Sequence, residues 1–123
     1  MANTEIALKE AMMIEGALGV ALVDLTSGMA LAALGGGKEL DMNAAAAGNT
    51  DVVRAKLRVM EMLGIEGGIE DILISLTGQY HVIRPLTRRN GTGLFLYLAM
   101  DRKRANLALA RRQLQQVEAG IEL

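Results

Sequence analysis

Residues 40–63 constrain the fold most, because they predict one long helix that carries apolar side chains on two sides. Successive helical residues advance by about 100°. One stripe consists of Ala46, Thr50, Val53, Leu57 and Met60. A second stripe, about 100° from the first, consists of Ala45, Gly48, Val52, Val59 and Leu63. A helix that covers one sheet needs only one stripe. Either this is a single wide stripe padded with alanine, or the second stripe packs against another body.

The strand pattern predicts a sheet with two strands in its interior. Residues 17–23 and 94–100 are apolar on both faces, as expected for strands covered on both sides. Residues 72–77 alternate and follow two acidic residues, which favours an edge position. Residues 29–34 and 80–84 predict the second and fourth strands, and Asn90-Gly91 predicts a hairpin turn before the fifth.

Two further helices complete the predicted order. The first covers residues 4–15 and ends at Gly16. The last begins after Asp101 as N-cap and carries one apolar stripe. The order is helix, two strands, helix, three strands, helix. It predicts an α+β fold in which one antiparallel sheet has helices on both faces, within a single domain of residues 1–123.

Composition excludes several classes of protein. The chain has 123 residues, a net charge of −1, one histidine and no cysteine. Disulfides, thiolate catalysis and sites with two histidine ligands are therefore excluded, and the charge balance argues against a nucleic-acid binder. No signal peptide and no stretch long enough to enter a membrane are visible, so we expect a cytoplasmic protein. Only three residues are aromatic, which disfavours a ligand-binding domain.

None of the candidate chemical motifs predicts a catalytic, metal or cofactor site. The loop Gly35-Gly36-Gly37-Lys38 lacks the first glycine and the hydroxyl of a phosphate-binding loop, since Ala32 and Glu39 occupy those positions. His81 has no partners in a catalytic order. The arginines near Asn90-Gly91 and the basic residues of the last helix are interpreted as solvated surface. The sequence thus predicts a non-enzymatic interaction protein.

Several strings resemble the roadblock / dynein light chain family, most closely its bacterial branch, typified by the gliding-motility GTPase regulator. The resemblance covers residues 6–117. It is carried by Gly19-Val20-Ala21-Leu22-Val23-Asp24, the alanine-rich helix from Asn43, Ile72-Leu73-Ile74-Ser75 and Ala105-Asn106-Leu107-Ala108-Leu109-Ala110-Arg111. Gly48, inside the long helix, departs from the family pattern.

The resemblance implies a roadblock/profilin-like three-layer fold. The sheet would have the order 2-1-5-4-3, with the first and last helices on one face and the middle helix on the other. Family members typically form homodimers in which the third strands pair edge to edge and the middle helices pack side by side. This nominates as interface residues Ala45, Gly48, Val52, Val59, Leu63, Ile72 and Ile74.

The resemblance also implies a function. Bacterial members bind and regulate small Ras-like GTPases in signalling and contribute no catalytic residue or cofactor. The paired middle helices form part of the contact, which nominates Asn49, Arg54, Lys56 and Arg58 for partner binding. The alternative is a structural adaptor dimer that has no effect on GTP hydrolysis.

Overall fold

A computed structural model describes residues 2–86 and 93–121. It contains three helices and five strands within those residues. The elements are α1 (Ala2–Met12), β1 (Ala17–Asp24), β2 (Ala30–Gly35), α2 (Met42–Leu63), β3 (Ile72–Ser75), β4 (Gln79–Pro85), β5 (Leu94–Asp101) and α3 (Leu107–Ala119). The predicted turn at Asn90-Gly91 lies outside the described residues.

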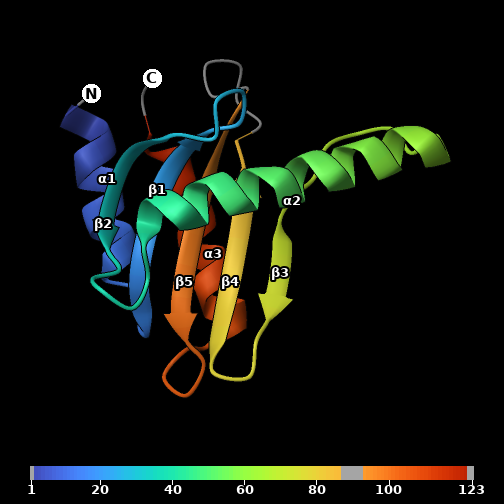
Figure 1. Cartoon of the computed structure of the whole chain (residues 1–123). Helices are drawn as coiled ribbons and strands as arrows, with labels where there is room; N and C mark the ends of the chain where they lie inside the picture. Colours follow the sequence, from blue (N-terminus) through green and yellow to red (C-terminus); the bar gives the residue numbers. More distant parts are fainter. Residues whose placement is uncertain (1, 87–92, 122–123) are drawn as a thin grey trace.

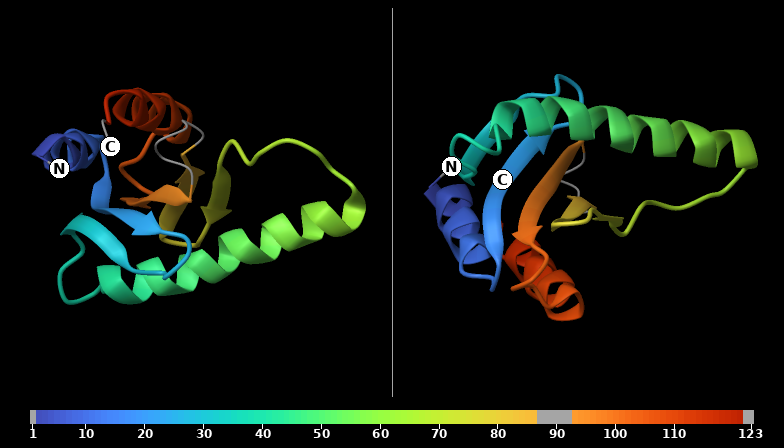
Figure 2. Two further views of the ribbon diagram at one scale, coloured as in Figure 1. Left: turned by 90° about the horizontal axis from the view of Figure 1, so that it is seen from above. Right: turned by 60° about the horizontal axis from the view of Figure 1, so that its bottom comes forward.

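The five strands form one antiparallel sheet in the order β2-β1-β5-β4-β3. Helices α1 and α3 cover one face of this sheet and α2 crosses the other (Figures 1 and 2). The predicted α+β class, strand order and three layers are therefore confirmed. Because β1 and β5 are interior strands, their side chains need apolar cover on both faces, as the sequence indicated.

Strand alternation divides the buried residues into two layers. On β1, Val20 and Leu22 face the layer under α1 and α3, whereas Ala21 and Val23 face the layer under α2. All four side chains are fully buried. The sheet is thus a rigid base on which α2 is positioned.

Helix α2 is continuous from its N-cap to its C-cap. The Asp41 carboxylate accepts hydrogen bonds from the amides of Asn43 (2.9 Å) and Ala44 (3.1 Å), which satisfies donors that a helix start leaves free. Gly64, with φ 70°, ends the helix in the left-handed conformation. Gly48, which departs from the family pattern, does not interrupt the helix.

Several predicted boundaries are wrong: α1 begins at Ala2 rather than residue 4, and β3 ends at Ser75 rather than residue 77. Helix α1 ends at Met12, before Glu15. Helix α2 begins two residues later than predicted, because Asp41 caps it. The N-cap of α3 is Asn106, whose side chain accepts from the amide of Leu109 at 3.2 Å. Asp101 instead ends β5 and accepts a hydrogen bond from the amide of Lys103. Its carboxylate therefore stabilises the turn before the helix.

Candidate interaction surface

Helix α2 reaches beyond the sheet. Its first half lies across the strands, and its C-terminal half continues past β3, the last strand on that side (Figures 1 and 2). Met42, Ala46, Thr50 and Val53 are buried against the sheet layer, whereas Met62 and Leu63 are 77% and 66% exposed. The helix therefore presents apolar side chains where no strand of the described chain lies beneath them.

The second apolar stripe is largely uncovered. Val52 and Val59 are 37% and 39% exposed, and Gly48 is exposed as well. Ala45 differs, because it packs in part against the layer under α2. Leu57 also departs from the prediction: it was placed on the sheet-facing stripe but is 40% exposed, since the helix has left the sheet at this point.

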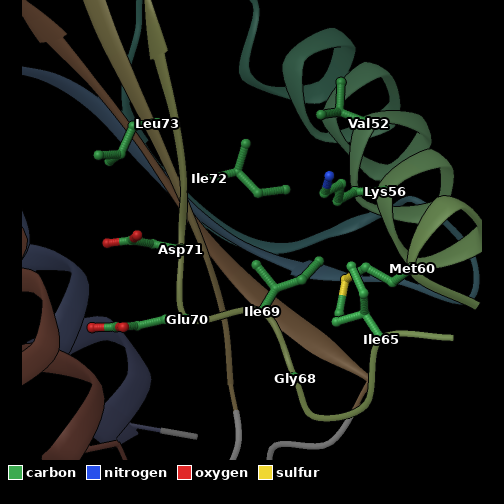
Figure 3. A pocket seen from close by; sticks show the side chains of 10 residues that line it. All are labelled: Val52, Lys56, Met60, Ile65, Gly68, Ile69, Glu70, Asp71, Ile72 and Leu73. Atoms are coloured by element: carbon green, nitrogen blue, oxygen red, sulfur yellow. The ribbon is translucent and has the colours of Figure 1, made fainter. Parts of the chain in front are cut away.

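A groove of about 560 Å³ separates α2 from β3 and from the loop that precedes it (Figure 3). Val52, Lys56 and Met60 line the helix side. Ile69 and Ile72 point across the groove toward α2, whereas Asp71 and Leu73 point away from it (Figure 3). The groove is therefore mainly apolar, with one lysine on its helix wall.

The outer edge of β3 is open. Leu76 donates its amide hydrogen to the carbonyl of Gln79 at 2.8 Å. Because hydrogen-bonded and non-bonded pairs alternate along an antiparallel ladder, Ile74 and Ile72 bond to β4. The main-chain groups of Leu73 and Ser75 then face outward. Such an edge is a template for another strand.

The nominated interface residues thus surround one region. Val52 and Ile72 line the groove, and Val59 and Leu63 lie on the same stripe of α2 as Val52. Ile72 and Ile74 project toward the α2 layer and are partly buried against it. The region combines an apolar helix flank, a groove and an unpaired strand edge.

The residues nominated for partner binding differ in accessibility. Arg54 is exposed, yet its guanidinium donates to the carbonyls of Leu25 (2.8 Å) and Thr26 (2.6 Å), which holds the β1–β2 turn to α2. Lys56 lines the groove. Arg58 is exposed. Asn49 is half-buried and donates to the carbonyl of Ala45. Lys56 and Arg58 are therefore the two whose side chains are most accessible to a partner.

A polar chain that sequence patterns did not indicate links α2 to β5 and β4. The Asn49 side chain lies near enough to the Tyr97 hydroxyl to lower its pKa. The Tyr97 hydroxyl lies 3.1 Å from Nδ1 of His81, and His81 Nε2 lies 2.7 Å from the side-chain carbonyl of Gln79. These partners fit a neutral imidazole that accepts at Nδ1 and donates from Nε2. No local motif could reveal it, since its members come from three elements.

Burial shifts the pKa values of this chain of groups. It lowers the pKa of His81 below its ordinary value of 6.5. It raises the pKa of Tyr97 to about 12, against the opposing effect of the Asn49 side chain. Both shifts favour the uncharged forms, so the layer under α2 carries no ionised group at these positions near neutral pH.

Two ion pairs fasten the opposite face. Arg111 of α3 forms two hydrogen bonds to the Asp71 carboxylate, at 2.8 and 3.2 Å, just before β3. The hydrogen bond to Asp71 raises the pKa of Arg111. Arg84 of β4 pairs with Glu118 of α3. The Asp71 side chain is only 8% exposed, although it stands at the start of an edge strand. The pair anchors the start of β3.

Within the described ranges, no group of three or more His, Cys, Asp or Glu side chains could hold a metal ion. The amides at the start of α2 are occupied by Asp41, so this helix end offers no vacant anion site. Across residues 2–86 and 93–121, no helix has the length and apolar character needed to cross a membrane.

Comparison with known proteins bears on the fold. No protein-family model and no curated protein matches the sequence. Solved structures do match. MglB of Myxococcus xanthus shares 18% identity over 97% of this chain and 88% of its own, with a TM-score of 0.75. A roadblock/LC7 domain from Streptomyces avermitilis shares 13% identity over 90% of this chain and 87% of its own, with a TM-score of 0.74.

The chain thus has the roadblock/LC7 fold, and the resemblance predicted from the sequence is confirmed at the level of the fold. MglB proteins are among the structures it resembles. The gliding protein MglB of Thermus thermophilus matches with a TM-score of 0.71 and 16% identity, over 98% of this chain and 91% of its own.

Proposed function

We propose that this chain is a non-enzymatic regulator that forms a homodimer through β3 and the second stripe of α2, and that the dimer binds a small Ras-like GTPase in the cytoplasm. The observation that carries the proposal is the meeting of three uncovered features on one side of the molecule. They are the overhanging half of α2, the groove of about 560 Å³ and the open edge of β3. One partner surface can cover all three.

A second copy is the partner that fits these features best. Two copies of β3 can pair about a two-fold axis, because the same edge then supplies both strands. The outward groups of Leu73 and Ser75 pair with one another when Ile74 lies opposite Ile74 of the second copy. This register continues the sheet and directs the overhanging α2 of each copy toward the other. The Leu73 side chain, which is 40% exposed and points away from the groove beside α2, would also lose contact with solvent.

The GTPase part of the proposal is supported by the likeness to the MglB structures and by the polar residues of α2. Arg58 is exposed and does not line the groove, so a GTPase can reach it from the solvent. Lys56 stands on the groove wall and would lie at the border of the proposed helix pair. Asn49 and Arg54 complete the proposed contact, with Arg54 also holding the β1–β2 turn. None of these residues is assigned a catalytic role.

The dimer is tested by solution mass and by crosslinking. Light scattering should give about twice 13.1 kDa. The chain has no cysteine, so Ile74→Cys introduces a single thiol. Opposed residues of a non-hydrogen-bonded pair lie about 4.5 Å apart at Cα, within the range of a disulfide. Mild oxidation should therefore give a covalent dimer. Leu109→Cys on α3, which is 44% exposed and so more accessible than Ile74, should not crosslink. A monomer, or equal crosslinking of both variants, would contradict the proposal.

The regulatory role is tested with purified Ras-like GTPases from the same genome. Binding should be at least about tenfold tighter to one nucleotide state than to the other, which corresponds to ~1.4 kcal/mol of differential contact. Arg58→Ala, at a residue that does not line the groove, should weaken it without changing the dimer. Binding that is equal in the GTP and GDP states would favour the structural adaptor instead. Binding to no GTPase would refute the GTPase part alone.

A further inference from the structure

Strand β2 forms the second edge of the sheet, on the side opposite the overhanging end of α2 (Figures 1 and 2). Its residues, Ala30–Gly35, include no charge and no proline. The register with β1 shifts by one residue at Leu31, which forms a bulge and is 48% exposed. Beyond this bulge, the edge lacks the charged or proline residues that usually prevent another strand from pairing.

Two hydrogen bonds at the end of the ladder identify the main-chain groups that face outward. Gly36 donates its amide hydrogen to the carbonyl of Leu18 at 2.8 Å. By alternation, Leu34 and Ala32 then bond to β1, and Ala33 lies opposite Ala21 as a non-hydrogen-bonded pair. The N–H and C=O of Ala33 therefore point away from the sheet. They are available to an added strand.

A groove lies on each side of this edge. One, of about 300 Å³, lies between α1 and β2 and is lined by Leu8 and Leu31 among others. The second, of about 520 Å³, lies between β2 and the start of α2 and includes Leu40. Both grooves include Ala33 and Leu34. Because α1 and α2 cover opposite faces of the sheet, the two grooves flank the edge above and below.

We infer that the β2 edge binds an extended peptide segment of a partner protein as an added strand. The main chain of the segment would bond to Ala33. Side chains of an extended strand alternate between faces, so successive residues would enter the α1-side groove and the α2-side groove in turn. The α1-side groove, with leucines from α1 and β2, accommodates a branched aliphatic side chain.

Size and charge both select this occupant. A second copy pairing through its own β2 would offer small side chains at four of six positions, three alanines and one glycine, which would leave much of each groove empty. Each groove also carries one acidic and one basic residue, Glu5 with Lys9 and Asp41 with Lys38. Neither groove therefore favours a strongly charged ligand, which disfavours nucleic acid and anionic lipid. An uncharged segment with bulky side chains fits both.

The inference is tested with a phage-displayed library of random peptides, selected on the immobilised full chain. Both variants add bulk at Ala33, so the comparison between them isolates the main-chain donor: the selected peptides should bind Ala33→Pro at least about tenfold more weakly than Ala33→Val. Proline removes a donor that faces outward, so the β1 ladder loses no hydrogen bond. Valine adds a side chain of similar bulk and keeps the donor. Circular dichroism checks that both variants remain folded.

Amide hydrogen exchange keeps the test decisive if Ala33→Pro does not fold. In the free chain the Ala33 amide should exchange rapidly, and a bound peptide should slow it by at least about tenfold, since the amide becomes hydrogen-bonded. Failure to select any peptide, equal binding to both variants, or unchanged exchange at Ala33 would overturn the inference. The inference would also be overturned if, without peptide, exchange of the Ala33 amide became slower as the protein concentration increased, because a second copy would then occupy the edge. These results do not depend on the β3 dimer, since β2 is free in either state.

Discussion

Replacing Val59 tests the proposed dimer most directly, because this side chain lies on the second stripe of α2 and is 39% exposed. Fully burying a valine contributes about 1.5–3 kcal/mol. Burying only the exposed 39% of Val59 in the interface then contributes about 0.6–1.2 kcal/mol of dimerisation free energy per protomer. The two-fold symmetric dimer contains two such valines, so the contribution doubles. Because alanine keeps one of the three side-chain carbons, Val59→Ala removes about two thirds of this and should raise the dimer dissociation constant roughly 4- to 15-fold.

Val59→Glu should act more strongly, because each protomer would bury an unpaired carboxylate at the helix contact. We expect the dissociation constant to rise more than about a thousandfold, which corresponds to ~4 kcal/mol. The monomer should remain folded, since exposed substitutions usually change the free energy of unfolding by less than about 0.5 kcal/mol.

Sedimentation equilibrium over a range of protein concentrations measures both variants. Leu109→Glu on α3 is the matched control, because Leu109 is 44% exposed and lies outside the proposed interface. Its dissociation constant should equal that of the parent chain. If Val59→Glu stays dimeric and folded, the second stripe is not the interface. If Leu109→Glu dissociates to the same extent, the effect is one of general charge rather than of the α2 stripe.

Three further predictions concern the stability of the fold. His81 has a lowered pKa when folded, so its contribution to the free energy of unfolding should be constant above pH 6.5, fall as the pH drops through the folded pKa, and then level off. Urea titrations of the parent chain and of His81→Gln at several pH values test this. An unchanged pH profile in the variant would refute it. Glu118→Ala leaves Arg84, whose side chain is 12% exposed, as an unpaired buried charge and should lower the free energy of unfolding by roughly 3–5 kcal/mol. Replacing both residues by leucine should lower it much less. Equal decreases for the two variants in chemical denaturation would contradict this. Gly36→Ala should lower the melting temperature more than Gly37→Ala does. Both positions have positive φ, but only the Cβ added at residue 36 would collide with a main-chain carbonyl and a methionine side chain. Equal melting temperatures of the two variants would show that the collision is relieved.

Local patterns accounted for the elements and their order. The apolar runs of β1 and β5 reflect burial on both faces, so they also indicated that these two strands are interior. They did not indicate β4, the third interior strand. Boundaries were predicted less well where two capping residues competed. Asp101 and Asn106 are both good N-caps, and only the packed turn determines that Asn106 caps α3.

The candidate surface was predictable in part. The period of α2 revealed its second stripe, because one sequence segment contains the whole pattern. The same period misplaced Leu57, since it cannot show where a helix leaves the sheet. The groove beside β3 depends on the path of the loop before β3, which local propensity does not fix.

The sequence alone determined the class of fold, the strand order implied by its resemblance and the two-sided character of the middle helix. The fold class and the two-sided helix follow from periodicity, which is a local property of the chain, whereas the strand order came only from the resemblance. Only the tertiary structure decided which polar groups meet. Arg111 bonds to Asp71 across 40 residues, and Tyr97 bonds to His81 across 16. Such pairs arise when the sheet brings distant segments together, because a buried polar group needs a partner from whatever element lies beside it.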